Sequence, residues 1–225
     1  GVAAIAAVGT VRSGIQAGLV SKGAELLGGD AEAEFTYRFA NQSEHMWMQG
    51  QATTVSQIVD FRSMAVVERN GKIERGLTQI KAIDEFYPLY GKPKLRSGEE
   101  FSKVFVQTGD HPPALMERLI ADRLALEIGD TFKLGTTTFI LADIITLIPD
   151  GAGDGFGLGP RTLVMTKDLE KSGLIAPGTL FSTKYRLKLP QDADLDTLAK
   201  LVEIDLSSSG LRWRDAREAA PGIST

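Results

Sequence analysis

The sequence predicts an α+β protein of two lobes. Strands with alternating apolar residues occur near both ends of the chain, Asn70-Gly71 marks a long hairpin, and the closing strand, helix and strand resemble residues 31–67. Alternation with a period of two is typical of half-buried strands, and Asn-Gly is a preferred two-residue hairpin turn. We therefore expect one lobe built from both chain ends, with a β-rich insert between them.

The N-terminal run of eleven residues carries no charge and continues into a helix that we expect to end at Gly28-Gly29. Apolar residues recur there at the spacing of one helical face: Val8, Val11, Ile15 and Leu19. A membrane-spanning helix needs roughly 20 apolar residues. The run is therefore either the last turns of such a helix or a small-residue helix buried in a soluble core.

The elements expected next are a strand over 35–39, a short helix, and a long hairpin. Phe35, Tyr37 and Phe39 alternate and should share one face of the strand. Asn41 followed by Glu44 has the spacing of a capping box at the start of a helix. The hairpin should run from 55 to 83 around its Asn-Gly turn.

The composition of the chain changes in its middle. Residues 86–97 are rich in Pro and Gly and indicate a linker. After it we expect these elements in order: a short strand at 104–106, a helix over 114–127, a hairpin over 130–147, a glycine-rich loop over 151–159, a strand at 161–165 and a short helix at 168–171. The apolar residues expected to form a separate core for this insert are Leu119, Leu124, Phe132, Phe139, Ile144 and Val164.

The end of the chain is expected to contain a strand over 181–189, a helix over 192–202 and a strand over 211–214. These elements are too short to bury their own apolar faces. Phe181 to Leu189 should therefore pair beside strands from the first third of the chain, which returns the chain to the first lobe.

Composition excludes several classes of function. The net charge of −4 leaves no basic surplus for nucleic acid. The absence of cysteine removes thiol nucleophiles, disulfides and cysteine metal sites. The only histidines, His45 and His111, occur in no zinc-binding or nucleophile-elbow motif. The alternating glycines of 151–159 match neither a dinucleotide-binding nor a phosphate-binding loop. We expect no catalytic residue, no cofactor and no metal.

Five apolar residues are candidates for contact with a partner or substrate. Phe156 and Leu158 lie in the glycine-rich loop, where regular packing is not available to them. Met46, Trp47 and Met48 lie on the short helix and could form an adaptable surface, although such a trio is also typical of a partly buried helix.

Three strings, in order, support a family resemblance: Leu27-Gly-Gly-Asp30, Tyr87-Pro-Leu-Tyr-Gly91 and Gly155-Phe-Gly-Leu-Gly-Pro-Arg161. The chain resembles the MacB-type periplasmic core domain of FtsX-like ABC transporter permeases. Within that group it is similar to the first extracytoplasmic domain of large two-domain permeases linked to lysophospholipase-associated export. It departs from the family at Ala125, where relatives often have glycine.

The resemblance implies a domain division. Residues 1–30 would be the end of a transmembrane helix and a stalk helix. Residues 31–94 and 179–225 would form a mixed α/β Porter-like lobe. Residues 95–178 would form an inserted, mainly β, Sabre-like lobe. The resemblance thus favours the membrane interpretation of the N-terminal run over the soluble one.

The resemblance also implies a non-catalytic function. The domain would lie in the periplasm, in a permease of the bacterial inner membrane that couples cytoplasmic ATP hydrolysis to export or membrane extraction of a lipid-like substrate. Its partners would be a cytoplasmic ATPase subunit, the second extracytoplasmic domain of the same permease, and a periplasmic esterase or lysophospholipase. The alternatives are a periplasmic hydrolase of the esterase type and a free-standing periplasmic binding module.

Overall fold

The computed structural model describes the backbone of residues 2–151 and 159–220, with side chains from residue 14 onward. One ten-stranded sheet runs through the molecule in the order β10-β1-β9-β2-β3-β8-β5-β7-β4, and β6 pairs with β2 and β7. The strands are β1 (Ala31–Thr36), β2 (Thr54–Arg69), β3 (Lys72–Ile83), β4 (Lys94–Leu95), β5 (Pro113–Glu117), β6 (Thr131–Leu134), β7 (Thr137–Leu147), β8 (Arg161–Met165), β9 (Phe181–Lys188) and β10 (Arg212–Asp215).

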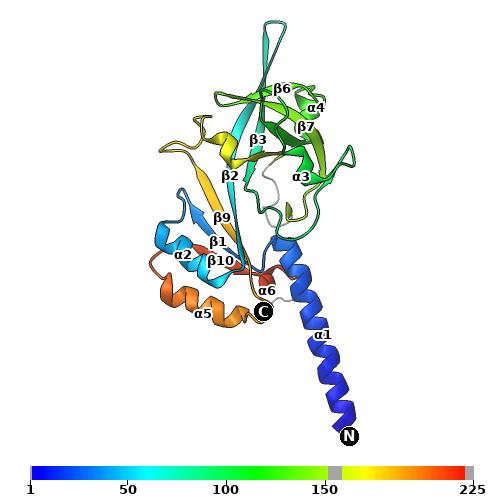
Figure 1. Ribbon diagram of the computed structural model, residues 1–225, viewed down its shortest axis with the longest axis vertical. Coiled ribbons are helices and arrows are strands. Elements are labelled where there is room, and N and C mark those ends of the chain that lie inside the picture. The colour runs from blue at the N-terminus through cyan, green and yellow to red at the C-terminus, as the bar shows by residue number, and fades with distance from the viewer. Residues whose placement is uncertain (1, 152–158, 221–225) are drawn as a thin grey trace.

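The helices are short, except for the first. They are α1 (Val2–Leu27), α2 (Gln42–Gln51), α3 (Phe101–Val104), α4 (Arg118–Arg123), the 3₁₀ helix η2 (Thr166–Leu169), α5 (Leu195–Asp205) and α6 (Ala216–Ala219). This mixture of helices and strands confirms the predicted α+β class. In Figure 1, α1 projects away from the rest of the molecule as a straight rod.

Helix α1 ends where the sequence predicted. Gly28 takes a left-handed φ of 82°, and the amides of Gly28 and Gly29 both donate to the carbonyl of Ala24. Only residues with little steric penalty adopt this conformation readily, so glycine at this place fixes the end of the helix. Among the described residues, no helix has both the length and the apolarity needed to cross a membrane.

The two chain ends meet in the lower half of the sheet. Strand β9 lies between β1 and β2 and pairs antiparallel with both, as predicted from its apolar face. Phe35, Tyr185 and Leu187 are buried on one face of these strands, with Met48 of α2 and Leu198 of α5 packed against them. Figure 1 shows α2 and α5 covering this face.

The capping box and the hairpin are also confirmed. The Asn41 side chain accepts from the Glu44 amide at 2.8 Å, and the Glu44 carboxylate accepts from the Asn41 amide at 2.9 Å. Asn70 and Gly71 have φ values of 51° and 74°, which the turn between β2 and β3 requires.

Three local predictions are wrong. The first strand covers 31–36 rather than 35–39, because Tyr37 turns to a left-handed φ of 60° and is largely exposed. Residues 101–104 form one helical turn, where a strand was expected at 104–106. The helix expected over 114–127 is instead β5 followed by α4, because β5 is inserted between β7 and β8 and is buried there.

The insert does not have a core of its own. Leu124, Phe132, Phe139, Ile144 and Val164 are buried as expected, but in one cluster with residues of the β2–β3 hairpin and of β9, among them Val59, Phe61, Ile80 and Phe181. Leu119 is 61% exposed. The hairpin continues from the lower half of the sheet into the upper half (Figure 1), so both halves pack against the same two strands.

Candidate functional site

The most distinctive feature of the structure is the contact between the C-terminal turns of α1, at Gly23 and Gly28, and the elements beside them. We call this contact the joint. The last turns of α1 pack on α6, on β1 and on β10, with Ala24 and Leu27 buried. A methyl group at Gly23 would overlap the carbonyl oxygen of Ala216 and would lie 3.0 Å from the amide nitrogen of Ala220. The backbones of α1 and α6 therefore touch at Gly23, and only glycine permits this approach.

Gly28 forms a second close contact of the joint. A methyl group at Gly28 would lie 2.6 Å from Nη1 of Arg186 and 3.0 Å from Cβ of Asp150. The end of α1 thus rests directly on a buried charged pair. Its carbonyl groups carry the negative end of the helix dipole, which favours a neighbouring cation.

Asp150 is the centre of this charged cluster. Its carboxylate accepts from Nζ of Lys81 at 2.7 Å, from the hydroxyl of Tyr87 at 2.6 Å, and from Nη1 of Arg186. The side chains of Asp150, Lys81 and Arg186 are each 1% exposed. Lys81 comes from β3, Arg186 from β9, and Asp150 from the segment after β7, so the cluster joins three distant parts of the sheet.

The cluster extends to the strands that follow α1 and precede α6. Nε of Arg186 donates to Glu32 of β1 at 3.0 Å, and Nη2 of Arg214 on β10 donates to the same carboxylate at 2.6 Å. Glu32 and Arg186 face each other in the register of β1 and β9. Because side chains alternate along a strand, they lie on the face opposite the apolar layer of α2 and α5.

Both carboxylates of the cluster are held in the charged form. Burial alone would raise the pKa of Asp150, but Lys81 and Arg186 reverse this and hold that pKa below its usual range. Burial also acts to raise the pKa of Glu32, and Arg186, Lys184 and Arg214 lower it overall. Removing one partner of such a buried pair leaves an uncompensated charge and is strongly destabilising. The cluster therefore favours one arrangement of the strands it joins.

The segment 87–91 packs against the joint. The hydroxyl of Tyr90 donates to Oδ2 of Asp30 at 2.9 Å, and the same oxygen accepts from the Leu189 amide at 2.8 Å. A methyl group at Gly91 would lie 2.5 Å from Pro149 and 3.7 Å from Glu25 of α1. The segment 87–91 is thus held between α1 and the end of β7, and burial together with Asp30 raises the pKa of Tyr90.

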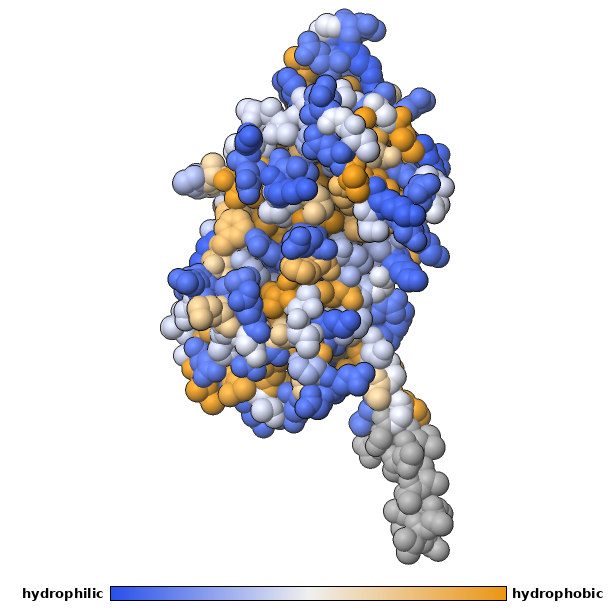
Figure 2. All heavy atoms as spheres, in the orientation of Figure 1, coloured by the Kyte–Doolittle hydropathy of each residue, from blue (hydrophilic) through white to orange (hydrophobic). Residues whose placement is uncertain are grey.

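The structure separates the predicted contact residues of α2. Met48 is fully buried, and Trp47 is half-buried, with its indole nitrogen donating to Asp205 at 2.8 Å. Met46 is 62% exposed, and Ile204 of α5 is 72% exposed. Figure 2 shows apolar residues gathered at the lower left, over α2 and α5. Phe156 and Leu158 lie outside the described residues.

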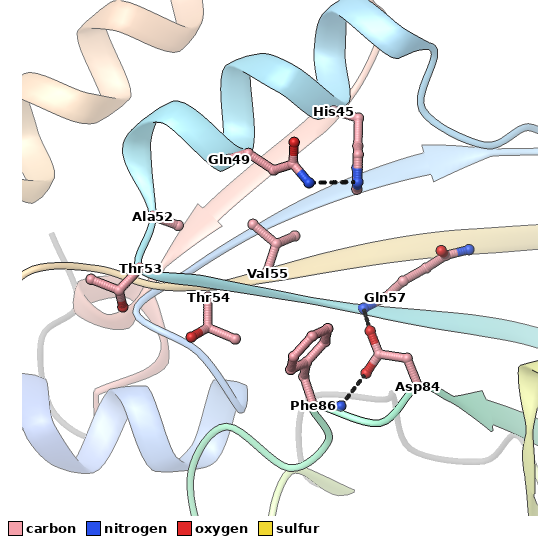
Figure 3. A pocket seen from close by; sticks show the side chains of 9 residues that line it. All are labelled: His45, Gln49, Ala52, Thr53, Thr54, Val55, Gln57, Asp84 and Phe86. Carbon is pink, nitrogen blue, oxygen red and sulfur yellow. Dashed lines mark hydrogen bonds between the residues drawn. The ribbon is translucent and has the colours of Figure 1, made fainter.

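A pocket of about 490 Å³ with a mixed polar and apolar lining lies beside α2, at the start of β2. His45 lines it and shares a hydrogen bond of 3.3 Å with Gln49 (Figure 3). His111 is exposed in the other half of the molecule, so the two histidines are not brought together. Within the described residues, no three His, Asp or Glu side chains are placed to hold a metal ion.

Sequence analysis missed the charged cluster. A signal was present, since Lys81, Arg186 and Glu32 each interrupt a strand whose alternate residues are apolar. Charges at such positions usually face solvent in a half-buried strand, whereas here the end of α1 at Gly28 and the residues Tyr87 and Asp150 contact the cluster.

Comparison with known proteins agrees with this architecture. No family profile matches the chain. The chain is 26% identical over 196 residues to the uncharacterized ABC transporter permease YbbP of Escherichia coli K12, an alignment that covers 82% of this chain and 22% of the relative. The chain therefore spans about a fifth of the length of that permease.

Two solved structures share the fold. The periplasmic region of MacB from Actinobacillus actinomycetemcomitans matches with a TM-score of 0.54 at 12% identity, over 87% of this chain and 92% of that one. The extracellular domain of the noncanonic ABC-type transporter YknZ from Gram-positive bacteria matches with a TM-score of 0.51 at 12% identity, over 82% and 100%. The resemblance to MacB-type extracytoplasmic domains of ABC transporter permeases is confirmed.

Proposed function

We propose that this MacB-type extracytoplasmic domain of an ABC transporter permease transmits movement from the membrane part of a longer chain to the sheet. The observation that carries the proposal is the joint of α1, in which Gly23, Gly28 and the charged cluster hold one end of a continuous helix of 26 residues. At about 1.5 Å per residue, such a helix can carry a displacement over roughly 40 Å without a hinge.

The path of force follows the contacts at the end of α1. A pull on α1 acts directly on β1, which follows it, and through Gly23 on α6 and β10. Through Arg186 and Asp150 it acts on β9, and through Lys81 on β3. Since β3 runs into the upper half of the sheet, both halves would move with the helix.

The energy source we propose is ATP hydrolysis by a cytoplasmic ATPase subunit that binds the membrane part of the permease. The uncharged residues 1–11 would be the outer end of the first membrane helix, with the domain in the periplasm and the permease in the inner membrane. The match to a much longer permease supports this placement. The division into a lobe of 31–94 and 179–225 and a lobe of 95–178 remains part of the proposal.

The proposed cargo is lipid-like, to be exported or extracted from the membrane. The exposed apolar side chains over α2 and α5, Met46 and Ile204, support a contact with an apolar partner there. The second extracytoplasmic domain of the same permease and a periplasmic esterase or lysophospholipase are the proposed partners. Phe156 and Leu158 remain candidates for contact with the cargo.

The test is a substitution that interrupts α1 far from the joint. Gln16 is exposed in the middle of α1, and proline there removes a helical hydrogen bond and kinks the helix at a cost of about 3 kcal/mol. In the full-length permease with its ATPase in proteoliposomes, Gln16→Pro should abolish ATP-driven removal of a fluorescent lysophospholipid and leave ATP hydrolysis measurable. Gln16→Ala should retain both activities.

Two outcomes would contradict the proposal. Undiminished lipid removal by Gln16→Pro would show that no force passes through α1. Ester hydrolysis by the purified chain that disappears in His45→Ala or His111→Ala would favour the hydrolase alternative.

A further inference from the structure

The pocket beside α2 has features of a small-molecule site. Its volume of about 490 Å³ lies within the range of roughly 300–1,000 Å³ that is usual for ligand pockets. Figure 3 shows that three segments contribute to it: α2 supplies His45 and Gln49, β2 supplies Thr54 and Gln57, and the segment after β3 supplies Asp84 and Phe86.

Asp84 builds one wall of the pocket rather than offering a free charge. Its Oδ1 accepts from the hydroxyl of Ser56 at 2.8 Å and from the amide of Phe86 at 3.1 Å. Its Oδ2 accepts from the amide of Gln57 at 2.7 Å. Both carboxylate oxygens are therefore engaged in fixing the start of β2 and the position of Phe86 (Figure 3).

Phe86 presents an aromatic surface at this wall. Its side chain is 50% exposed, although phenylalanine is most often buried. Its backbone is held by Asp84, so the ring stands at the pocket without being covered by the core. An exposed ring of this kind offers a flat apolar face to a ligand.

The other polar side chains of the pocket are neutral hydrogen-bonding groups, and Ala52 and Val55 add apolar surface. Gln49 and Gln57 each offer an amide, Thr54 offers a hydroxyl, and His45 offers a ring nitrogen. None of the described residues that line the pocket is Lys or Arg. An anionic ligand would therefore find no permanent cation here, and a cationic ligand would find a carboxylate that is already engaged.

We propose that this pocket binds a neutral carbohydrate. A sugar ring has an apolar face that fits against Phe86 and a rim of hydroxyl groups, each both donor and acceptor, that fit Thr54. A second sugar unit would reach Gln57, whose side chain lies on the α2 side of β2, together with Gln49 and His45 (Figure 3). This site is separate from the joint of α1, and its test does not depend on the transport proposal.

The experiment is an NMR titration of the isotope-labelled 225-residue chain with chitobiose, and with citrate and spermidine as charged probes. Chitobiose should shift the amide signals of residues 45–57 and 84–86, and the charged probes should not. Phe86→Ala should weaken chitobiose binding about twofold to twelvefold, the usual range for one aromatic contact. Ser43→Ala, which changes an exposed residue of the same helix outside the pocket lining, should leave binding unchanged.

The proposal is overturned if chitobiose shifts no signal of the pocket, or if citrate or spermidine shifts the same signals. Equal weakening by Phe86→Ala and Ser43→Ala would also overturn it. Gln57→Leu provides a second variant that leaves the wall of Phe86 in place. Binding that survives both Phe86→Ala and Gln57→Leu would place the ligand elsewhere.

Discussion

Replacing Gly23 with alanine is expected to loosen α1 from the rest of the domain, whereas the same change at Gly18 is not. Both residues lie in α1. The space around Gly18 is open to 4 Å, while a methyl group at Gly23 would overlap the Ala216 carbonyl and approach the Ala220 amide. The two variants therefore make the same chemical change in one helix and differ only in what the new methyl group meets.

The magnitude follows from two opposing contributions. Alanine stabilises a helix interior by about 1 kcal/mol relative to glycine, and Gly18→Ala should show this gain alone. Overpacking costs about 1–3 kcal/mol. The upper part of that range applies at Gly23, because the atoms in the way are backbone atoms that cannot rotate aside. The net loss at Gly23 should be about 1–2 kcal/mol, which changes an opening equilibrium about fivefold to thirtyfold.

Hydrogen exchange of the backbone amides of residues 19–27 measures this equilibrium directly. Gly23→Ala should speed their exchange by that factor, and Gly18→Ala should leave it unchanged or slow it. Equal effects of the two substitutions would refute the close approach of α1 and α6. A Gly23→Ala variant with unchanged exchange would refute it as well.

Three further predictions concern stability, each measured by equilibrium unfolding in denaturant. Ala125 has a φ of 48°, so Ala125→Gly should stabilise the fold by up to about 1 kcal/mol; destabilisation would contradict the left-handed conformation. The Arg38 hydrogen bond lowers the pKa of Glu44 from 4.5 to about 2. Because Arg38 is 39% exposed and solvent screens the pair, its contribution should be about 1–2 kcal/mol, present above pH 4.5 and lost as the pH falls toward 2, and Glu44→Gln should remove that pH dependence. Asp150→Asn should cost about 3–5 kcal/mol, since it leaves buried cations without their carboxylate; Asp192→Asn, at an exposed position, should cost almost nothing.

Apart from the pairing of β9 with β1 and β2, the features predicted correctly from the sequence depend on neighbours along the chain. The capping box of Asn41 and Glu44 needs residues three apart, and the turn at Asn70-Gly71 needs two adjacent residues with positive φ. Gly28 ends α1 for a similarly local reason.

The features that were missed depend on distant partners. Strand β5 is a short apolar run that is buried between two other strands, and its periodicity does not distinguish it from a buried helix. Lys81 and Asp150 are 69 residues apart in the chain, so no local pattern reveals their pairing. The core of the insert was assigned too locally, because the β2–β3 hairpin and Phe181 complete it.

Ala125 was predicted only in part from the sequence. The resemblance marked it as a position where glycine is common in relatives, and its left-handed φ gives the physical reason. The sequence identified the unusual position, while the structure was needed to show that α4 ends at Arg123, two residues earlier.

The central claim is that α1 and the sheet move as one rigid body, and a distance between them tests it most directly. These 225 residues contain no cysteine, so, with any cysteine elsewhere in the permease replaced by serine, spin labels can be placed at Gln16→Cys on α1 and at Ser207→Cys after α5, both exposed positions. The full-length permease with its ATPase would be measured with ATP bound and after hydrolysis. We predict one narrow distance distribution that is the same in both states. A broad distribution, or one that shifts between the two states, would contradict transmission through the joint.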